Sequence, residues 1–146
     1  MVHALEEIRR LLRAGGCLID IHPVREAPII DVRTSDAVTF SEPSAGYDYD
    51  EDLRRAERAL TTAVRRGLFA LDASHEFEFH TSARSVRELR DFFAVYSAYE
   101  EDPADDEVEA RVDAFYGRVD DVMRSSGPGA RVVHRERALM SRLNPI

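Results

Sequence analysis

The sequence has no lysine, a single cysteine and no long apolar stretch, and each shortage removes a class of function. All 20 basic residues are arginine, so catalysis through a lysine Schiff base is excluded. Cys17 has no second cysteine for a disulfide, and its place in an apolar run predicts a buried, unreactive thiol in a reducing cytoplasm. No apolar run approaches the ~20 residues of a membrane span, so no membrane partner is expected.

The chain is acidic. Its 146 residues carry a net charge of −8 and are 44% hydrophobic. Length and apolar content predict one globular domain over residues 1–146. The negative charge opposes the counterion release that drives binding to nucleic acids, and it disfavours anionic membrane surfaces. Nucleic acid is therefore not an expected partner either.

Residues 4–21 predict a helix, a stop and a strand in direct succession. Apolar residues recur there at the steps of one helix face: Leu5, Ile8, Leu11 and Leu12. Gly15 offers the positive φ that ends a helix. Residues 17–21 form a mostly apolar run whose only charge is Asp20. Such a run is typical of a strand covered on both faces in a parallel sheet.

This segment resembles the helix, Leu-x-x-Gly-Gly and hydrophobic strand that lead into the fifth strand of class I S-adenosylmethionine-dependent methyltransferases. Ala14 stands where the family usually has proline. The family holds its cofactor with a glycine-rich turn and an acidic residue, both upstream of the matching segment. This chain has no G-x-G-x-x-G fingerprint. We therefore expect it to bind no cofactor, with S-adenosylmethionine bound only if a partner supplies the site.

The middle of the chain predicts a hairpin followed by a helix and a strand. The hairpin joins β-type runs at 28–32 and 37–40. A helix runs from Asp48 or Asp50 to Arg66, where Gly67 supplies the stop. Residues 75–81 alternate strictly between apolar and polar side chains, which indicates a half-exposed strand.

The last third predicts two helices and a closing strand. Ser85 and Glu88 form a capping box that opens a helix with an apolar and aromatic stripe for the core: Leu89, Phe92, Phe93 and Tyr96. An acidic linker at 100–107 precedes a helix over 107–124, and the run 131–143 should pair antiparallel with the 75–81 strand.

Together these elements predict a mixed α/β (α+β) fold with three to five strands and three to four helices. The order of the strands at 17–21, 75–81 and 131–143 is similar to that of the family's fifth, sixth and seventh strands. In the family the seventh strand is inserted antiparallel between the other two. The resemblance therefore implies part of a Rossmann-like sheet, namely the C-terminal half of the methyltransferase fold.

Asp20 and His22 are the candidate catalytic residues. They lie two apart on a predicted strand, so they share a face, and His22 lies at the carboxyl end, where open α/β sheets bind ligands. They could act as a general acid/base pair or contact a substrate. The plainer interpretation is a buried aspartate that bonds to a helix end and a histidine at a strand terminus.

Two further groups of residues have a functional and a structural interpretation. Glu76, Glu78 and His80 share one strand face and could bind a divalent metal. They could instead pair with Arg135 and Arg137 across the sheet, whereas His134 and Glu136 would join that face if the register slipped by one residue.

Tyr96 and Tyr99 could line a hydrophobic substrate pocket with His22, although helical aromatics are usually core residues. No serine lies in a G-x-S-x-G elbow, so covalent acyl chemistry is unsupported.

Three hypotheses for function follow. The first is a truncated or degenerate methyltransferase-like protein that is not catalytic alone. The second is methyl transfer to a small molecule, with the cofactor half supplied by another chain. The third is a non-enzymatic dimeric domain for small-ligand binding or assembly. A homodimer is expected because no fourth strand covers the outer edge of residues 17–21, unless residues 29–40 fold back over it.

Overall fold

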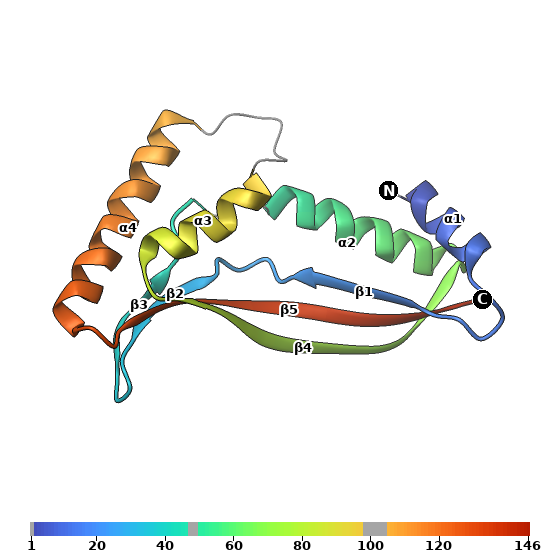
Figure 1. Ribbon diagram of the computed structural model, residues 1–146. Helices are drawn as coiled ribbons and strands as arrows, with labels where there is room; N and C mark the ends of the chain where they lie inside the picture. Colours follow the sequence, from blue (N-terminus) through green and yellow to red (C-terminus); the bar gives the residue numbers. More distant parts are fainter. Residues whose placement is uncertain (1, 47–49, 98–104) are drawn as a thin grey trace. The chain divides into compact units, whose positions relative to one another are not determined.

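The computed structural model describes residues 2–46, 50–97 and 105–146, which form four helices and five strands (Figure 1). In chain order these are α1 (Val2–Leu11), β1 (Leu18–Pro23), β2 (Ile29–Arg33), β3 (Val38–Pro43), α2 (Asp50–Arg65), β4 (Phe69–Ala83), α3 (Val86–Ser97), α4 (Asp106–Ser126) and β5 (Arg131–Pro145). The predicted mixed α+β class is confirmed, within the expected numbers of helices and strands. None of the helices in these ranges combines the length and the apolar character that a membrane crossing needs.

The strands pair around β5. β1 pairs antiparallel with β5, from Leu18 opposite Leu143 to Pro23 opposite Ala138. β2 pairs antiparallel with both β3 and β5, and β4 also pairs with β5. The predicted hairpin is therefore the β2–β3 pair, and the predicted pairing of the last strand with the 75–81 strand is the β4–β5 pair. Both predictions are confirmed.

The chain divides into two compact units. Unit 1 comprises Met1–Glu26, Asp48–Glu78 and Arg137–Ile146, and unit 2 comprises Ala27–Tyr47 and Phe79–Glu136. β4 and β5 contribute residues to both units. Each unit has a buried core of its own. The single domain expected over residues 1–146 stays a prediction.

In unit 1, α1 and α2 cover one face of the sheet. Small side chains on α2, Ala59 and Ala63, pack with Leu5 of α1 and with Phe69 and Leu143 of the sheet. Leu18 lies opposite Leu143 and packs against the same cluster. Because side chains alternate along a strand, the face of β1 that carries Leu18 also carries Asp20 and His22. The two polar side chains thus lie on the helix-covered face.

The expectation that residues 17–21 form a strand of a parallel sheet, covered on both faces, is wrong. β1 is antiparallel to its partner, and Ile19 and Ile21 are 47% and 59% exposed. A short apolar run does not specify the direction of its neighbour, and here only one face packs on helices. Cys17, expected to be buried, is half-buried just before β1.

The segment before β1 follows the predicted order with a shorter helix. α1 ends at Leu11 rather than Ala14. Gly15 has the expected positive φ, 77°, and the Gly16 N–H donates to the carbonyl of Arg13 at 2.9 Å. The chain therefore makes a turn between helix and strand, and the glycine supplies its left-handed residue.

In unit 2, α3 and α4 pack on β2 and β5. The fully buried side chains include Ile30, Val32, Leu89, Val119 and Val132. The predicted capping box is confirmed: the Glu88 N–H donates to Ser85 Oγ at 3.1 Å, and the Arg84 N–H donates to the Glu88 carboxylate at 2.7 Å. The aromatic stripe is only partly core, because Phe92 is 46% exposed. Most of the predicted acidic linker, residues 100–104, lies outside the described residues.

Candidate functional site

Asp20 and His22 form a hydrogen-bonded pair on β1. His22 Nδ1 lies 2.6 Å from Asp20 Oδ2, and the side chains are 11% and 24% exposed respectively. An ionised carboxylate can only accept a hydrogen bond, so the Nδ1 atom carries the proton. In the neutral ring the Nε2 atom is then an acceptor. This is the arrangement in which an aspartate orients a histidine for proton transfer.

A second polar pair lies beside the first. Asp20 is opposite Ser141 in the β1–β5 ladder, and Ser141 Oγ lies 3.3 Å from Ser74 Oγ on β4. Ser141 is 8% exposed. No sequence motif marks Ser141, since neither hydroxyl lies in a nucleophile elbow. Only the register of β5 against β1 brings it to Asp20.

The described residues do not test the substrate pocket predicted from His22, Tyr96 and Tyr99. Tyr96 belongs to α3 in unit 2. Its side chain and the whole of Tyr99 lie outside the described part of the chain. The pocket formed by His22, Tyr96 and Tyr99 stays a prediction.

The candidate metal ligands take part in other interactions. Glu76 is ion-paired with Arg137, which also binds Glu26 at 2.7 Å. Glu78 and His80 also have interaction partners. Within residues 2–46, 50–97 and 105–146, no group of three histidine, cysteine, aspartate or glutamate side chains is placed to hold a metal ion. The ion pair of Glu76 with Arg137 matches the cross-strand pairing that the sequence offered as the ordinary alternative.

His134, which a slipped register would bring to that face, lies in the core of unit 2. His134 lies opposite Ile30 and is 7% exposed, with its ring centroid 4.6 Å from that of Phe93. Burial lowers the pKa of His134, whose Nδ1 atom has no hydrogen-bond partner, so the imidazole is neutral in the core. Burial also raises the pKa of Glu136. His134 is a core residue.

A buried carboxylate in unit 2 was not predicted. Asp31 is 1% exposed, and its Oδ2 atom accepts from Arg33 Nη2 at 2.6 Å and from Arg135 Nε at 3.3 Å. Burial raises the pKa of Asp31, but hydrogen bonds from Ser41 and Arg33 and the charge of Arg135 lower it by more, and the result lies below the ordinary value. Arg33 and Arg135 provide the compensation that a buried charge requires. Arg33 lies two residues from Asp31 on β2, whereas only the pairing of β2 with β5 brings Arg135 to Asp31.

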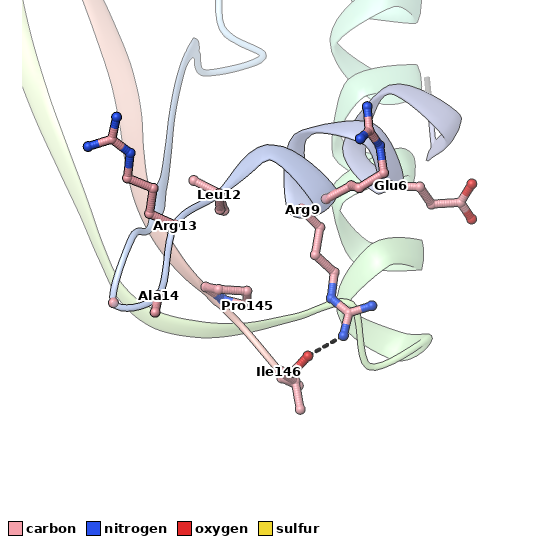
Figure 2. A pocket seen from close by; sticks show the side chains of 9 residues that line it. Glu6, Arg9, Leu12, Arg13, Ala14, Pro145 and Ile146 are labelled. Atoms are coloured by element: carbon pink, nitrogen blue, oxygen red, sulfur yellow. Dashed lines mark hydrogen bonds between the residues drawn. The ribbon is translucent and has the colours of Figure 1, made fainter.

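A hollow in unit 1 lies elsewhere, at the end of α1 (Figure 2). Its volume is about 560 Å³, and arginines line much of it. Neither Asp20 nor His22 belongs to its walls. No motif in the sequence singles out these arginines.

The chain was compared with protein-family models, with curated proteins and with solved structures, and none of them matches it. The resemblance of residues 4–21 to the methyltransferase segment therefore stays a prediction, and its support comes from this chain's own residues and topology.

Proposed function

We propose that this chain is a truncated or degenerate relative of class I S-adenosylmethionine-dependent methyltransferases that does not transfer methyl groups alone. The observation that carries the proposal is the strand order in unit 1. β5 pairs with β1 and with β4, and α2 connects β1 to β4 along the chain, after the β2–β3 hairpin. A last strand between two earlier ones is the arrangement of the family's fifth, seventh and sixth strands.

The chain's own residues support a missing cofactor site. Its single G-x-G sequence, Gly127-Pro128-Gly129, leads from α4 into β5. The cofactor fingerprint needs the reverse order, a strand followed by a helix whose N-terminus faces the ligand. We therefore infer that no S-adenosylmethionine binds to this chain by itself.

A second candidate is methyl transfer to a small molecule with the cofactor half supplied by another chain or by an upstream part of the reading frame. The Asp20–His22 pair favours it. His22 Nε2 would accept the proton that a substrate nucleophile loses on methylation, and Asp20 would stabilise the resulting imidazolium. The free edge of β1 also favours it, since β5 is the sole partner of β1 among the described strands. The family's fourth strand would lie at that edge.

A third candidate is a dimeric ligand-binding or assembly domain without catalysis. The same free edge supports it, because a second copy could pair there. For all three candidates we infer a cytoplasmic protein, from its single, unpaired cysteine.

Isothermal titration of the purified chain with S-adenosylmethionine and S-adenosylhomocysteine tests the first proposal. We expect no saturable heat at tens of micromolar ligand, because the glycine turn and the acidic ribose partner are absent. A dissociation constant below roughly 10 μM would refute it. An in-frame strand and glycine-rich turn encoded upstream of Met1 would favour the second candidate over the first.

A further inference from the structure

The pocket at the end of α1 has a strongly basic lining. Its lining includes three arginines, Arg9, Arg10 and Arg13, and a single carboxylate, that of Glu6. Figure 2 shows the Arg9 side chain directed toward Ile146 and the Arg13 side chain directed away from it. The volume of about 560 Å³ is in the range of sites that hold small organic molecules.

The contacts around the pocket leave one of these charges, that of Arg13, without a partner among the described residues. Glu6 lies 3.4 Å from Arg66, and Arg10 lies 2.9 Å from Glu7. Arg9 donates to a main-chain oxygen of Ile146. The Arg13 guanidinium makes no hydrogen bond or ion pair with any residue in the described ranges. Arg13 is therefore the unpaired cation of this pocket within the described ranges, although the chain as a whole carries a net charge of −8.

Helix stability explains only part of this positive charge. Arg9 and Arg10 lie in the last turn of α1, where cations offset the partial negative charge of the helix end. Arg13 lies beyond the helix, which ends at Leu11. It is also available to turn toward a ligand, because no partner holds it. Apolar side chains form the rest of the lining, among them Leu12 and Pro145.

We propose that this pocket binds a small organic anion, a molecule with a phosphate or carboxylate group joined to an apolar portion. The anionic group would lie between Arg9 and Arg13, whose planar guanidinium groups bind both oxyanions through paired hydrogen bonds. The apolar portion would contact Leu12 and Pro145. The proposal is independent of the methyltransferase resemblance, because no residue of the Asp20–His22 pair takes part.

The test is an NMR titration of the ¹⁵N-labelled chain at low salt with phenyl phosphate and with benzoate, and with uncharged benzyl alcohol as the control. We expect saturable shifts of the Gly15 and Ala14 amides with at least one anion and none with benzyl alcohol. The stronger of the two anions identifies the ligand chemistry. Shifts that do not saturate with either anion overturn the proposal.

Variants assign the binding to the pocket. Arg13→Gln removes a guanidinium that has no hydrogen bond or ion pair within the described ranges, so we expect the fold to be retained. It should weaken binding of the stronger anion several-fold. The double variant Arg9→Gln with Arg13→Gln should weaken it at least about tenfold. Arg111→Gln makes the same change of charge as Arg13→Gln at an exposed position on α4. It should leave the affinity for the anion unchanged. Equal weakening by all three variants would mean general charge attraction and would overturn the proposal.

Discussion

The Nδ1 atom of His22 lies 2.6 Å from Oδ2 of Asp20, and this contact fixes which ring nitrogen carries the proton. The pair sits on the helix-covered face of β1, where both side chains are largely shielded from solvent. A histidine oriented in this way presents its Nε2 atom as an acceptor. The pair is thus a preorganised proton acceptor whether or not a substrate reaches it.

The first prediction concerns this tautomer. Above the pH at which the ring is protonated, the ¹⁵N shifts of His22 should report a proton on Nδ1. In Asp20→Ala the bond that favours this form is gone, and His22 should move to the Nε2-protonated form that is usual in water. His75, which is exposed, serves as the internal control and should be the same in both proteins. Nε2 protonation of His22 in the wild type would contradict the pair.

The second prediction concerns the turn before β1. Gly15 has a φ of 77°, and a Cβ there would meet nothing within 4 Å. Any cost of substitution therefore comes from the backbone alone. Gly15→Val should lower the free energy of unfolding by about 1–2 kcal/mol, whereas Gly15→Asn should cost less because asparagine tolerates this conformation. Thermal unfolding of the two variants decides it, and equal midpoints would show that the turn is not of this type.

The third prediction separates strain from crowding. Gly46 and Gly67 both have positive φ, 79° and 69°, but only at Gly46 would a Cβ clash, at 2.4 Å from Val112 Cγ2. Gly67→Ala should cost about 1 kcal/mol from the backbone. Gly46→Ala should cost about 1–3 kcal/mol more because α4 is overpacked. Urea unfolding measures both.

A double variant checks the cause of that difference. Val112→Ala removes the clashing methyl group, so Gly46→Ala should be less costly in the Val112→Ala background than in the wild type. An equal cost in both backgrounds would place the effect in the backbone.

The sequence predicted the long periodic elements well, for a physical reason. α2 and α4 carry apolar residues at helical steps over several turns. Ser85 and Glu88 encode the N-terminal cap of α3 locally. The β2–β3 hairpin is also local. The local sequence of such segments determines their secondary structure, and tertiary packing does not override it.

What the sequence could not predict depends on strand partners far along the chain. The mostly apolar residues 17–21 do not say whether β1 is parallel or antiparallel to its neighbour. Asp31 and Arg135 are 104 residues apart and meet only because β2 pairs with β5. Ser141 reaches Asp20 for the same reason. The Asp20–His22 contact was predictable, because residues two apart on a strand share a face.

The fourth prediction uses the lowered pKa of Asp31. The folded state binds this proton less readily than the unfolded chain, whose carboxyl has a pKa near 3.8. The stability that the carboxylate provides is therefore complete above about pH 5 and is lost as the pH falls through the lower pKa of the folded state. Urea unfolding from pH 7 downward should show a steeper loss below about pH 4 in the wild type than in Asp31→Asn.

At neutral pH, Asp31→Asn should itself lower the free energy of unfolding by about 1–3 kcal/mol, because Arg33 and Arg135 lose a charged acceptor. Asp36→Asn, in the exposed hairpin turn, is the matched control and should have little effect. Parallel pH profiles for the wild type and Asp31→Asn would show that the cluster does not set acid stability.

The last prediction is a homodimer through α1 and β1. Within the described ranges β1 pairs with β5 alone, and the fold-back of residues 29–40 over its outer edge does not occur, because β2 pairs with β5 and β3. Ile21 of β1 is 59% exposed, and Leu11 at the end of α1 is 69% exposed. An apolar edge strand of this kind is usually paired or covered, and a second copy can pair with it about a two-fold axis.

Light scattering at a protein concentration of about 100 μM should therefore report a dimer. A monomer at that concentration would contradict the prediction. Leu11→Asp and Ile21→Asp should each weaken the dimer at least about tenfold, because a charge would be buried at an apolar contact. Leu18→Asp is unsuitable, since Leu18 packs in the core of its own unit. Val95→Asp is the matched control: Val95 is 62% exposed on α3, outside the proposed interface. If the dimer stays intact in both Leu11→Asp and Ile21→Asp, the interface lies away from β1. The new carboxylate at each position would then remain in water.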